Sequence, residues 1–271
     1  CSFITGSAYS ETITGANTVN STSNNNTTQK KFNADGTSLT ISESTTLSTD
    51  SSQTVNIFTK NNGTVTVESG SSIFSNGALS SNAIQGKNQS GLTVTNSGTI
   101  SAGNSKAINL LDATNSIITN NTGGIIKSNT NTITVTATND NDANNVTINN
   151  SGEIYAYSTD PAADSAAIKS EADTDNITII NNSGGYIHSN NGNSSFTQGS
   201  TVFIASVSNG TLTNSGTIEN KAGTDAYVLG VAGIGVTVTL KDKGKVIGKI
   251  NVAGSGHTIK LQHGAGQAYF Y

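Results

Sequence analysis

The sequence predicts an all-β solenoid, a parallel β-helix wound from one chain in about nine or ten coils of three strands each. Three observations predict it. A five-residue phrase recurs along the chain, short bursts of apolar residues alternate with polar ones, and the composition holds too little apolar material for a globular core.

The recurring phrase reads Asn-Ser-Gly-x-Ile and returns about once per turn of a solenoid. Clear copies begin at Asn96, Asn150, Asn182 and Asn214. Degenerate copies contain Gly123 and Gly244. A period of roughly 20 to 50 residues is typical of stacked supersecondary units.

We expect each phrase to form a corner between two strands. Its glycine supplies the unusual backbone angles of a tight turn, and its Asn can bond the local backbone. The corner glycines expected on this basis are Gly98, Gly123, Gly152, Gly184, Gly216 and Gly244. The corner asparagines are Asn96, Asn150, Asn182 and Asn214, of which Asn150, Asn182 and Asn214 are predicted to stack and share amide hydrogen bonds along the rod.

Alternating apolar residues predict the strands. In the segment 92–110, apolar residues alternate with Ser, Thr or Asn around Val94, Ile100 and Ile108, which is the period of half-buried strands. The same three bursts recur in the following units. Three strands per coil, stacked in register, give the parallel β-helix.

The composition fits a rod better than a sphere. Apolar residues make up 33% of the 271 residues and charged residues 11%, about half of what a soluble domain usually carries. Disorder would also require a high net charge and no periodicity, whereas the net charge is -4. In a solenoid each coil buries its apolar residues against its neighbours, so a thin core is sufficient.

The chain divides into an N-terminal capping segment (1–31), the repeats (32–235) and C-terminal coils expected to stabilise the rod (236–271). Most coils carry insertions outside the corner phrase, the longest at 139–145, 158–165 and 192–199. We expect any function that depends on particular residues to lie in these insertions. The long insertions are loops on the variable surface of a solenoid.

Cys1 is the only cysteine, which excludes an internal disulfide. Its place at residue 1, in a chain without Met, predicts that a precursor was trimmed during export. Either a secretory signal was cleaved and left Cys first, or Cys1 carries a lipid.

Asn-Ser-Gly-x-Ile corners in an Arg-free chain rich in Ser, Thr and Asn resemble the passenger domain of a Gram-negative autotransporter. The glycine-rich segments 244–250, 254–261 and 264–266 are similar to the last coils before the linker and membrane barrel of that family. The resemblance implies a right-handed β-helix on the cell surface or outside a Gram-negative bacterium, with the outer membrane reached only through a missing barrel or an N-terminal lipid.

Catalytic residues are not expected. Lyases on this fold typically use basic residues, often Arg, and the chain has none. Glycoside hydrolysis needs two carboxylates in one cleft, and the nearest pair, Glu153 and Glu219, is expected to be solvated. His188 alternates outward on its strand, which indicates a surface histidine, and no Gly-Asp-Ser-Gly stretch accompanies the histidines.

Two acidic loops form a candidate calcium site. Asp140 and Asp142 precede one strand, and Asp173 and Asp175 precede the equivalent strand of the next coil. Stacking the coils would bring several hard oxygen ligands together, as Ca²⁺ requires. A hydrated acidic loop is the alternative, and no other cofactor is expected.

The function expected is that of a non-enzymatic extracellular rod, adhesin-like or structural, with a carbohydrate-active enzyme as the alternative. Its partner would be a glycan or protein of a host or neighbouring cell, or a second copy in filaments or layers. Tyr155, Tyr157 and Phe196 are the first candidates for a binding face, because aromatic rings anchor interfaces, although core or loop-anchoring roles stay open. The net charge of -4 and the sequence pI near 5.3 disfavour nucleic acid.

Overall fold

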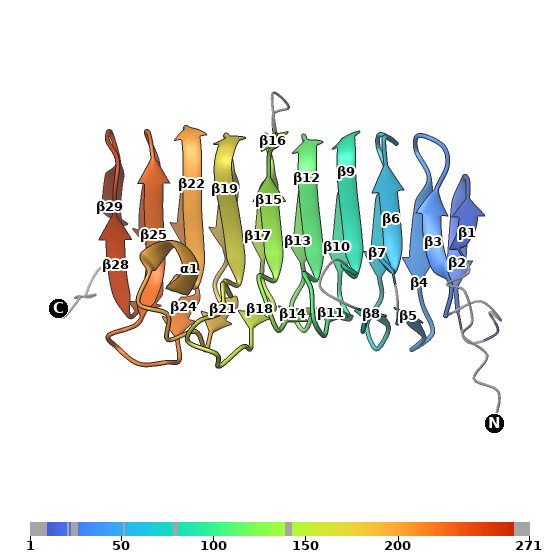
Figure 1. Cartoon of the computed structure of the whole chain (residues 1–271), viewed down its shortest axis with the longest axis horizontal. Helices are drawn as coiled ribbons and strands as arrows, with labels where there is room; N and C mark the ends of the chain where they lie inside the picture. The colour runs from blue at the N-terminus through green and yellow to red at the C-terminus, as the bar shows by residue number, and fades with distance from the viewer. Residues whose placement is uncertain are drawn as a thin grey trace.

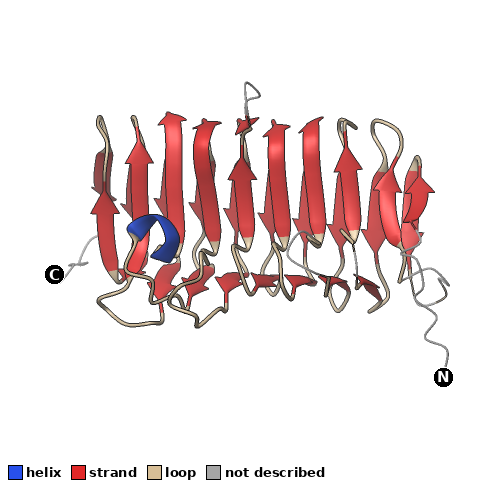
Figure 2. Cartoon of the chain, in the orientation of Figure 1, coloured by secondary structure: helices blue, strands red, loops and turns tan. Residues whose placement is uncertain are grey.

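Every regular element but one is a strand of a right-handed parallel β-helix, as predicted (Figure 1). The computed structural model describes residues 10–20, 22, 27–50, 52–77, 81–138 and 143–262. Within these residues the single helix is α1 (Phe196–Gly199), drawn in blue in Figure 2.

Three parallel sheets run along the rod, and successive strands of one coil pass from one sheet to the next. Sheet A consists of β1 (Ser10–Ile13), β3 (Gln29–Phe32), β6 (Val55–Phe58), β9 (Ile84–Ser90), β12 (Ile108–Thr114), β15 (Ile133–Thr136), β16 (Ala143–Asn144), β19 (Ile168–Asp175), β22 (Val202–Ser208), β25 (Tyr227–Gly233) and β28 (Lys249–Val252). Sheet B consists of β2 (Ala16–Val19), β4 (Ser38–Ile41), β7 (Thr64–Val67), β10 (Thr93–Asn96), β13 (Ile117–Asn120), β17 (Thr147–Asn150), β20 (Thr178–Asn181), β23 (Thr211–Asn214), β26 (Thr237–Lys241) and β29 (Thr258–Gln262). Sheet C consists of β5 (Thr46–Thr49), β8 (Ser72–Ser75), β11 (Thr99–Ala102), β14 (Ile125–Ser128), β18 (Glu153–Ala156), β21 (Tyr186–Ser189), β24 (Thr217–Asn220) and β27 (Lys245–Ile247).

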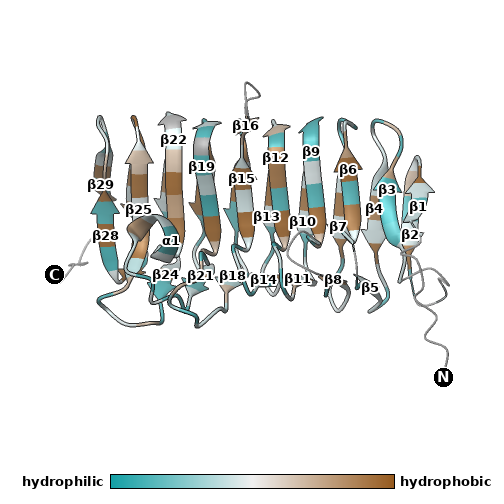
Figure 3. Ribbon diagram, viewed as in Figure 1, coloured by the Kyte–Doolittle hydropathy of each residue, from teal (hydrophilic) through white to brown (hydrophobic). Residues whose placement is uncertain are grey.

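Alternation along each strand builds the core. In most strands of sheets B and C the second and fourth residues are buried, while the first and third face outward. The hydropathy of successive residues along the strands is drawn in Figure 3. Register aligns like residues, so that Val94, Ile118 and Ile148 of successive coils form one column. Each such side chain stabilises the fold by about 1.5–3 kcal/mol relative to exposure. The ten strands of sheet B agree with the predicted number of coils.

A ladder of buried asparagines closes the edge of the core between sheets B and C. Its members are Asn96, Asn120, Asn150, Asn181 and Asn214, all with no exposed surface. Each Nδ2 donates to the Oδ1 of the next member over 2.8–2.9 Å. The predicted ladder is correct in kind.

The prediction for Asn182 is wrong, because Asn181 occupies the ladder position. The pairing of β20 places Asn181 beside Asn150 and Asn214. The corner that follows β20 holds four residues (182–185), and its first residue, Asn182, donates instead to Ser151 Oγ over 3.0 Å. Because this corner is longer, alignment of the Asn-Ser-Gly phrases by sequence placed Asn182, one residue too late, in the ladder position.

Short and long corners alternate from residue 68 onward. The short corners, of two residues each, are 97–98, 151–152 and 215–216; the long corners are 68–71, 121–124 and 182–185, of four residues each, and 242–244, of three. Every short corner therefore lies between two long ones.

The corner glycines serve two different purposes. Gly123 and Gly184 have φ of 83° and 85°, as expected for turn glycines. The same expectation is wrong for Gly98, Gly152, Gly216 and Gly244, which do not adopt positive φ. They are required because a Cβ atom would lie 2.2–2.3 Å from a backbone carbonyl oxygen of the preceding coil.

A second column of residues, just before the strands of sheet B, has the left-handed backbone conformation. One residue per coil, two positions before the strand, has φ between 50° and 76°. Its occupants are Gly36, Asn62, Gly91, Asn115, Asn145, Asn176, Asn209, Gly235 and Gly256. Gly and Asn are the residues that tolerate this left-handed conformation best, which explains part of the Asn and Gly content.

Both ends of the rod continue the strands of the solenoid. Residues 10–20, 22 and 27–31 supply β1, β2 and most of β3, so the described part of the capping segment is wound as a coil of the solenoid. At the other end, Ile259 and Leu261 are 47% and 49% exposed, so burial does not mark the C-terminal coils as the best packed. Their stabilising role stays a prediction. Cys1 and the glycines at 264 and 266 lie outside the described residues.

We predict that Asn150→Ala lowers the free energy of unfolding by about 2–4 kcal/mol, because the amides of Asn120 and Asn181 would both lose a buried partner. Asn182→Ala is the control. It removes a half-buried amide and should cost less than about 1 kcal/mol. Urea unfolding followed by circular dichroism measures both; equal midpoints would contradict the ladder.

Gly98→Ala and Gly123→Ala separate the two purposes of the corner glycines. An alanine at 98 meets the carbonyl oxygens of Ser71 and Glu68 at 2.2 and 2.4 Å, so we expect a loss of about 3 kcal/mol. An alanine at 123 meets no atom within 4 Å and is opposed only by its φ, at about 1 kcal/mol. Melting temperatures that rank the variants in the opposite order would show that turn geometry dominates at both positions.

Candidate functional site

Aromatic and charged side chains gather on the outer face of sheet C. The first and third residues of each strand point outward, and the register places Glu153 beside Tyr186, Tyr155 beside His188, and His188 beside Glu219. We call these five residues the aromatic cluster. They come from β18, β21 and β24.

His188 lies at the centre of the cluster. Its ring is stacked on Tyr155 with centroids 4.7 Å apart and an interplanar angle of 8°, and it lies 4.3 Å from the ring of Tyr186. Its Nε2 is 2.7 Å from Glu153 Oε1, and Tyr186 donates its hydroxyl to Glu219. The prediction that His188 points outward is correct, but its side chain is buried at 4% exposure because the neighbouring rings cover it.

The environment of the cluster keeps both of its titratable rings neutral. Burial lowers the pKa of His188 below its ordinary 6.5, although the hydrogen bond to Glu153 opposes this shift. Burial and the hydrogen bond to Glu219 raise the pKa of Tyr186 well above 10.0. At neutral pH both rings are therefore uncharged, and Glu153 and Glu219 each hold a partner within the cluster.

The aromatic cluster presents the faces of two tyrosine rings to a ligand, with a lysine ammonium group near each ring. Tyr155 and Tyr186 are half-buried, and Lys127 Nζ and Lys221 Nζ lie 5.9 and 4.9 Å from their ring centroids. Cation–π contacts of this kind help to fix the orientation of the rings.

A shallow depression of about 410 Å³ adjoins the aromatic cluster. It lies over the short corner 151–152 and is lined by Glu153, Tyr186 and the glycines of the long corners on either side. The alternation of corner lengths thus shapes the surface next to the rings.

The three predicted aromatic residues do not share one face. Tyr157 follows Tyr155 on the sheet C side, with ring centroids 6.2 Å apart, and donates its hydroxyl to the carbonyl of Ala102 over 3.2 Å. Phe196 begins α1 and packs edge-on against Phe203 and Tyr227 of sheet A. Phe196 therefore anchors an insertion, whereas the tyrosines belong to the outer surface.

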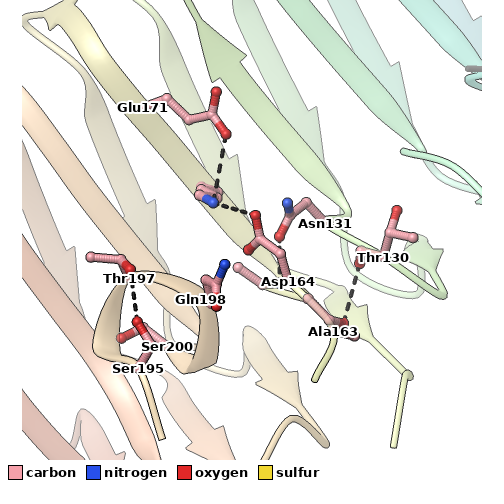
Figure 4. A network of polar contacts seen from close by, with 12 residues as sticks. Thr130, Asn131, Ala163, Asp164, Glu171, Ser195, Thr197, Gln198 and Ser200 are labelled. Atoms are coloured by element: carbon pink, nitrogen blue, oxygen red, sulfur yellow. Dashed lines mark hydrogen bonds and ion pairs between the residues drawn. The ribbon is translucent and has the colours of Figure 1, made fainter. Parts of the chain in front are cut away.

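Two of the predicted insertions pack against each other over sheet A (Figure 4). Asn191 Nδ2 donates to the carbonyl oxygens of Ala163 and Gln198, over 3.0 and 2.8 Å. Lys169 on β19 contacts Asp164 of the first insertion at 2.5 Å and Glu171 at 3.6 Å. These contacts fix the insertions as a cover over the C-terminal part of sheet A.

The described part of the calcium candidate does not form a metal centre. Asp173 is exposed, and Asp175 Oδ1 accepts a hydrogen bond from Ser208 over 2.9 Å. Across the residues that the structure describes, no group of three His, Cys, Asp or Glu side chains could hold a metal ion. Asp140 and Asp142, with residues 139–142 as a whole, lie outside the described residues.

Sequence reasoning missed Tyr186, its hydrogen bond to Glu219, and the contact of His188 with Glu153. Glu153 and Glu219 were expected to be solvated, but the structure shows them bonded to His188 and Tyr186. The outward positions could have been aligned in the sequence by counting from the first residue of each sheet C strand instead of from the corner glycine. That count brings Tyr155, His188 and Glu219 into one row.

No family model, curated protein or solved structure matches this chain. Over the described residues, the structure contains no helix with the length and hydropathy needed to span a membrane. The functional inference therefore rests on the geometry of the surface.

The burial of His188 predicts a pH-dependent stability. Its folded pKa lies below the value of 6.5 in the unfolded chain, so the unfolded state binds the proton first and stability falls as the pH drops through 6.5 toward the folded pKa. His188→Gln should flatten the change in urea midpoint between about pH 7.5 and pH 5.5. His257→Gln, outside the cluster, should leave the contribution of His188 in place. An unaltered slope in His188→Gln would show that other groups cause the dependence.

Proposed function

We propose that the chain is a non-enzymatic, adhesin-like rod, exposed on the surface or outside of a Gram-negative bacterium in the manner of an autotransporter passenger domain. In this proposal, it binds a glycan or protein of a host or neighbouring cell through the aromatic cluster. The observation that carries the proposal is the pair of half-buried tyrosine rings on the outer face of sheet C, one stacked on a buried His188 and the other tilted against it.

The fixed position of the rings supports binding. Tyr155 is held by stacking on His188, and Tyr186 by its hydrogen bond to Glu219, so little side-chain entropy remains to be lost when a ligand covers them. Aromatic anchors of this type contribute much of the energy of interfaces, and their faces also stack on the apolar faces of sugar rings.

A carbohydrate-active enzyme is the second candidate, because Glu153 and Glu219 project from the same face on β18 and β24. Against it, each carboxylate contacts a partner inside the cluster, and Tyr186 keeps its proton. Incubation with a panel of polysaccharides tests it directly. Turnover that is lost in Glu153→Gln would favour the enzyme.

The rods could act singly or associate into filaments or layers, which would make a second copy the partner. Electron microscopy of the purified protein separates these forms. Filaments that persist in Tyr155→Ala would show that association does not use the aromatic cluster.

Tyr155→Ala is expected to weaken binding to the cell-surface ligand by about tenfold, which corresponds to about 1.4 kcal/mol for one aromatic anchor. Phe74→Ala is the matched control, because Phe74 faces outward at the equivalent position of β8, away from the cluster. Binding to intact cells and to a glycan array measures both. Loss in the control but not in Tyr155→Ala would contradict the proposal.

A further inference from the structure

A groove with a polar floor and lysines around it lies on the N-terminal half of sheet A, on the strands that the two packed insertions leave uncovered. Its volume is about 470 Å³. We call it the basic groove and define it by Lys31, Lys87, Lys106, Gln85, Asn109 and Phe58, which are among its lining residues. It belongs to a different sheet from the aromatic cluster.

The floor of the basic groove is a network of amides held in place by the strand register. Gln85 on β9 pairs with Asn109 on β12, and Gln85 is 8% exposed. Its Oε1 accepts hydrogen bonds from Asn82 Nδ2 over 2.6 Å and from Asn109 Nδ2 over 3.1 Å. The amides are therefore fixed before a ligand arrives, which reduces the entropy lost on binding.

The charge of the basic groove is opposite to that of the whole chain. The net charge is -4, yet three lysines and no carboxylate are among the described lining residues. The ion pairs of the described residues involve Lys30, Lys169, Lys249 and His188, and none involves the three groove lysines. Lys31, Lys87 and Lys106 are thus available to an external anion.

An aromatic ring completes the groove. Phe58 is 46% exposed, and Lys87 Nζ lies 5.8 Å from its ring centroid. A flat apolar ring beside amides and ammonium groups matches a molecule that combines an apolar face, hydroxyl groups and a negative charge. Sugars that carry a carboxylate on the ring have all three features.

We propose that the basic groove binds a carboxylated oligosaccharide, with lysines on the carboxylates, amides on the hydroxyls and Phe58 against a sugar face. Lysine ammonium groups hold such anions as point charges. Nucleic acid would need a longer basic track with several stacking rings, whereas Phe58 is the only aromatic ring among the described lining residues. The proposal does not depend on the function proposed for the aromatic cluster.

Calorimetric titration with tetragalacturonate tests the proposal, with cellotetraose as the neutral ligand of equal length. We expect tetragalacturonate to bind with an affinity that falls as salt is raised, and cellotetraose not to bind. The double variant Lys87→Glu and Lys106→Glu should bind at least about tenfold more weakly. Lys241→Glu with Lys243→Glu, at the exposed end of β26 and in the corner after it, changes the net charge equally and should have no effect.

Several outcomes would overturn the proposal. They are no binding of tetragalacturonate, equal binding of cellotetraose, and an equal loss in the control variant. Tighter binding of a sulfated tetrasaccharide or of oligothymidylate would assign the groove to a different anion. If the double variant does not fold, Lys31→Gln and Phe58→Ala replace it, and unaltered affinity in both contradicts the groove.

The two proposed surfaces can be separated in the same experiment. Tyr155→Ala should retain its affinity for tetragalacturonate, because the aromatic cluster lies on sheet C. Loss of that affinity in Tyr155→Ala would place the binding of tetragalacturonate on sheet C and overturn the assignment to the basic groove.

Discussion

Register between neighbouring coils is the constraint on which the structure depends. A coil of this rod cannot bury its apolar residues alone, so each one must place its inward side chains directly over those of the coil before it. Slippage by one residue would turn the inward set outward. The asparagine ladder opposes slippage, because each of its three inner amides donates to one neighbour and accepts from the other. Hydrophobic burial supplies the driving force, and the amides specify the position.

Because the inward positions maintain the rod, the outward positions are available for surface chemistry. Their arrangement is regular, since residues far apart in sequence lie side by side in a parallel sheet. Sheet C uses this to assemble Tyr155, His188 and Glu219 from three coils. Sheet A uses it to align amides and lysines at one end, while the packed insertions cover the other end. The two surfaces differ in charge and in ring content, which is why we infer different ligand chemistry for each.

Much of the fold could be predicted from the corner phrase and the alternation of apolar residues, because both follow directly from stacking. The position of Asn182 could not, since the number of residues in each corner depends on packing against the coils on either side. The reason for a glycine at position 98 could not be predicted either, because the sequence does not show which carbonyl oxygen of the preceding coil lies next to it. The contacts of His188 were missed for the same reason: they join coils, and their alignment depends on the length of every corner and insertion between them. The basic groove lies on strands without the corner phrase, so no motif indicated it.

Because short and long corners alternate, the structure along most of the rod repeats every two coils rather than every coil. Each of the glycines at 98, 152 and 216 fits under the last carbonyl group of the long corner before it. Removal of a single coil that carries a long corner would bring two short corners together, and neither would then place a long corner's last carbonyl group beside the glycine of the other. Removal or duplication of two coils preserves the pattern. Lengthening or shortening of this region by two coils at a time therefore preserves the contacts of its corner glycines.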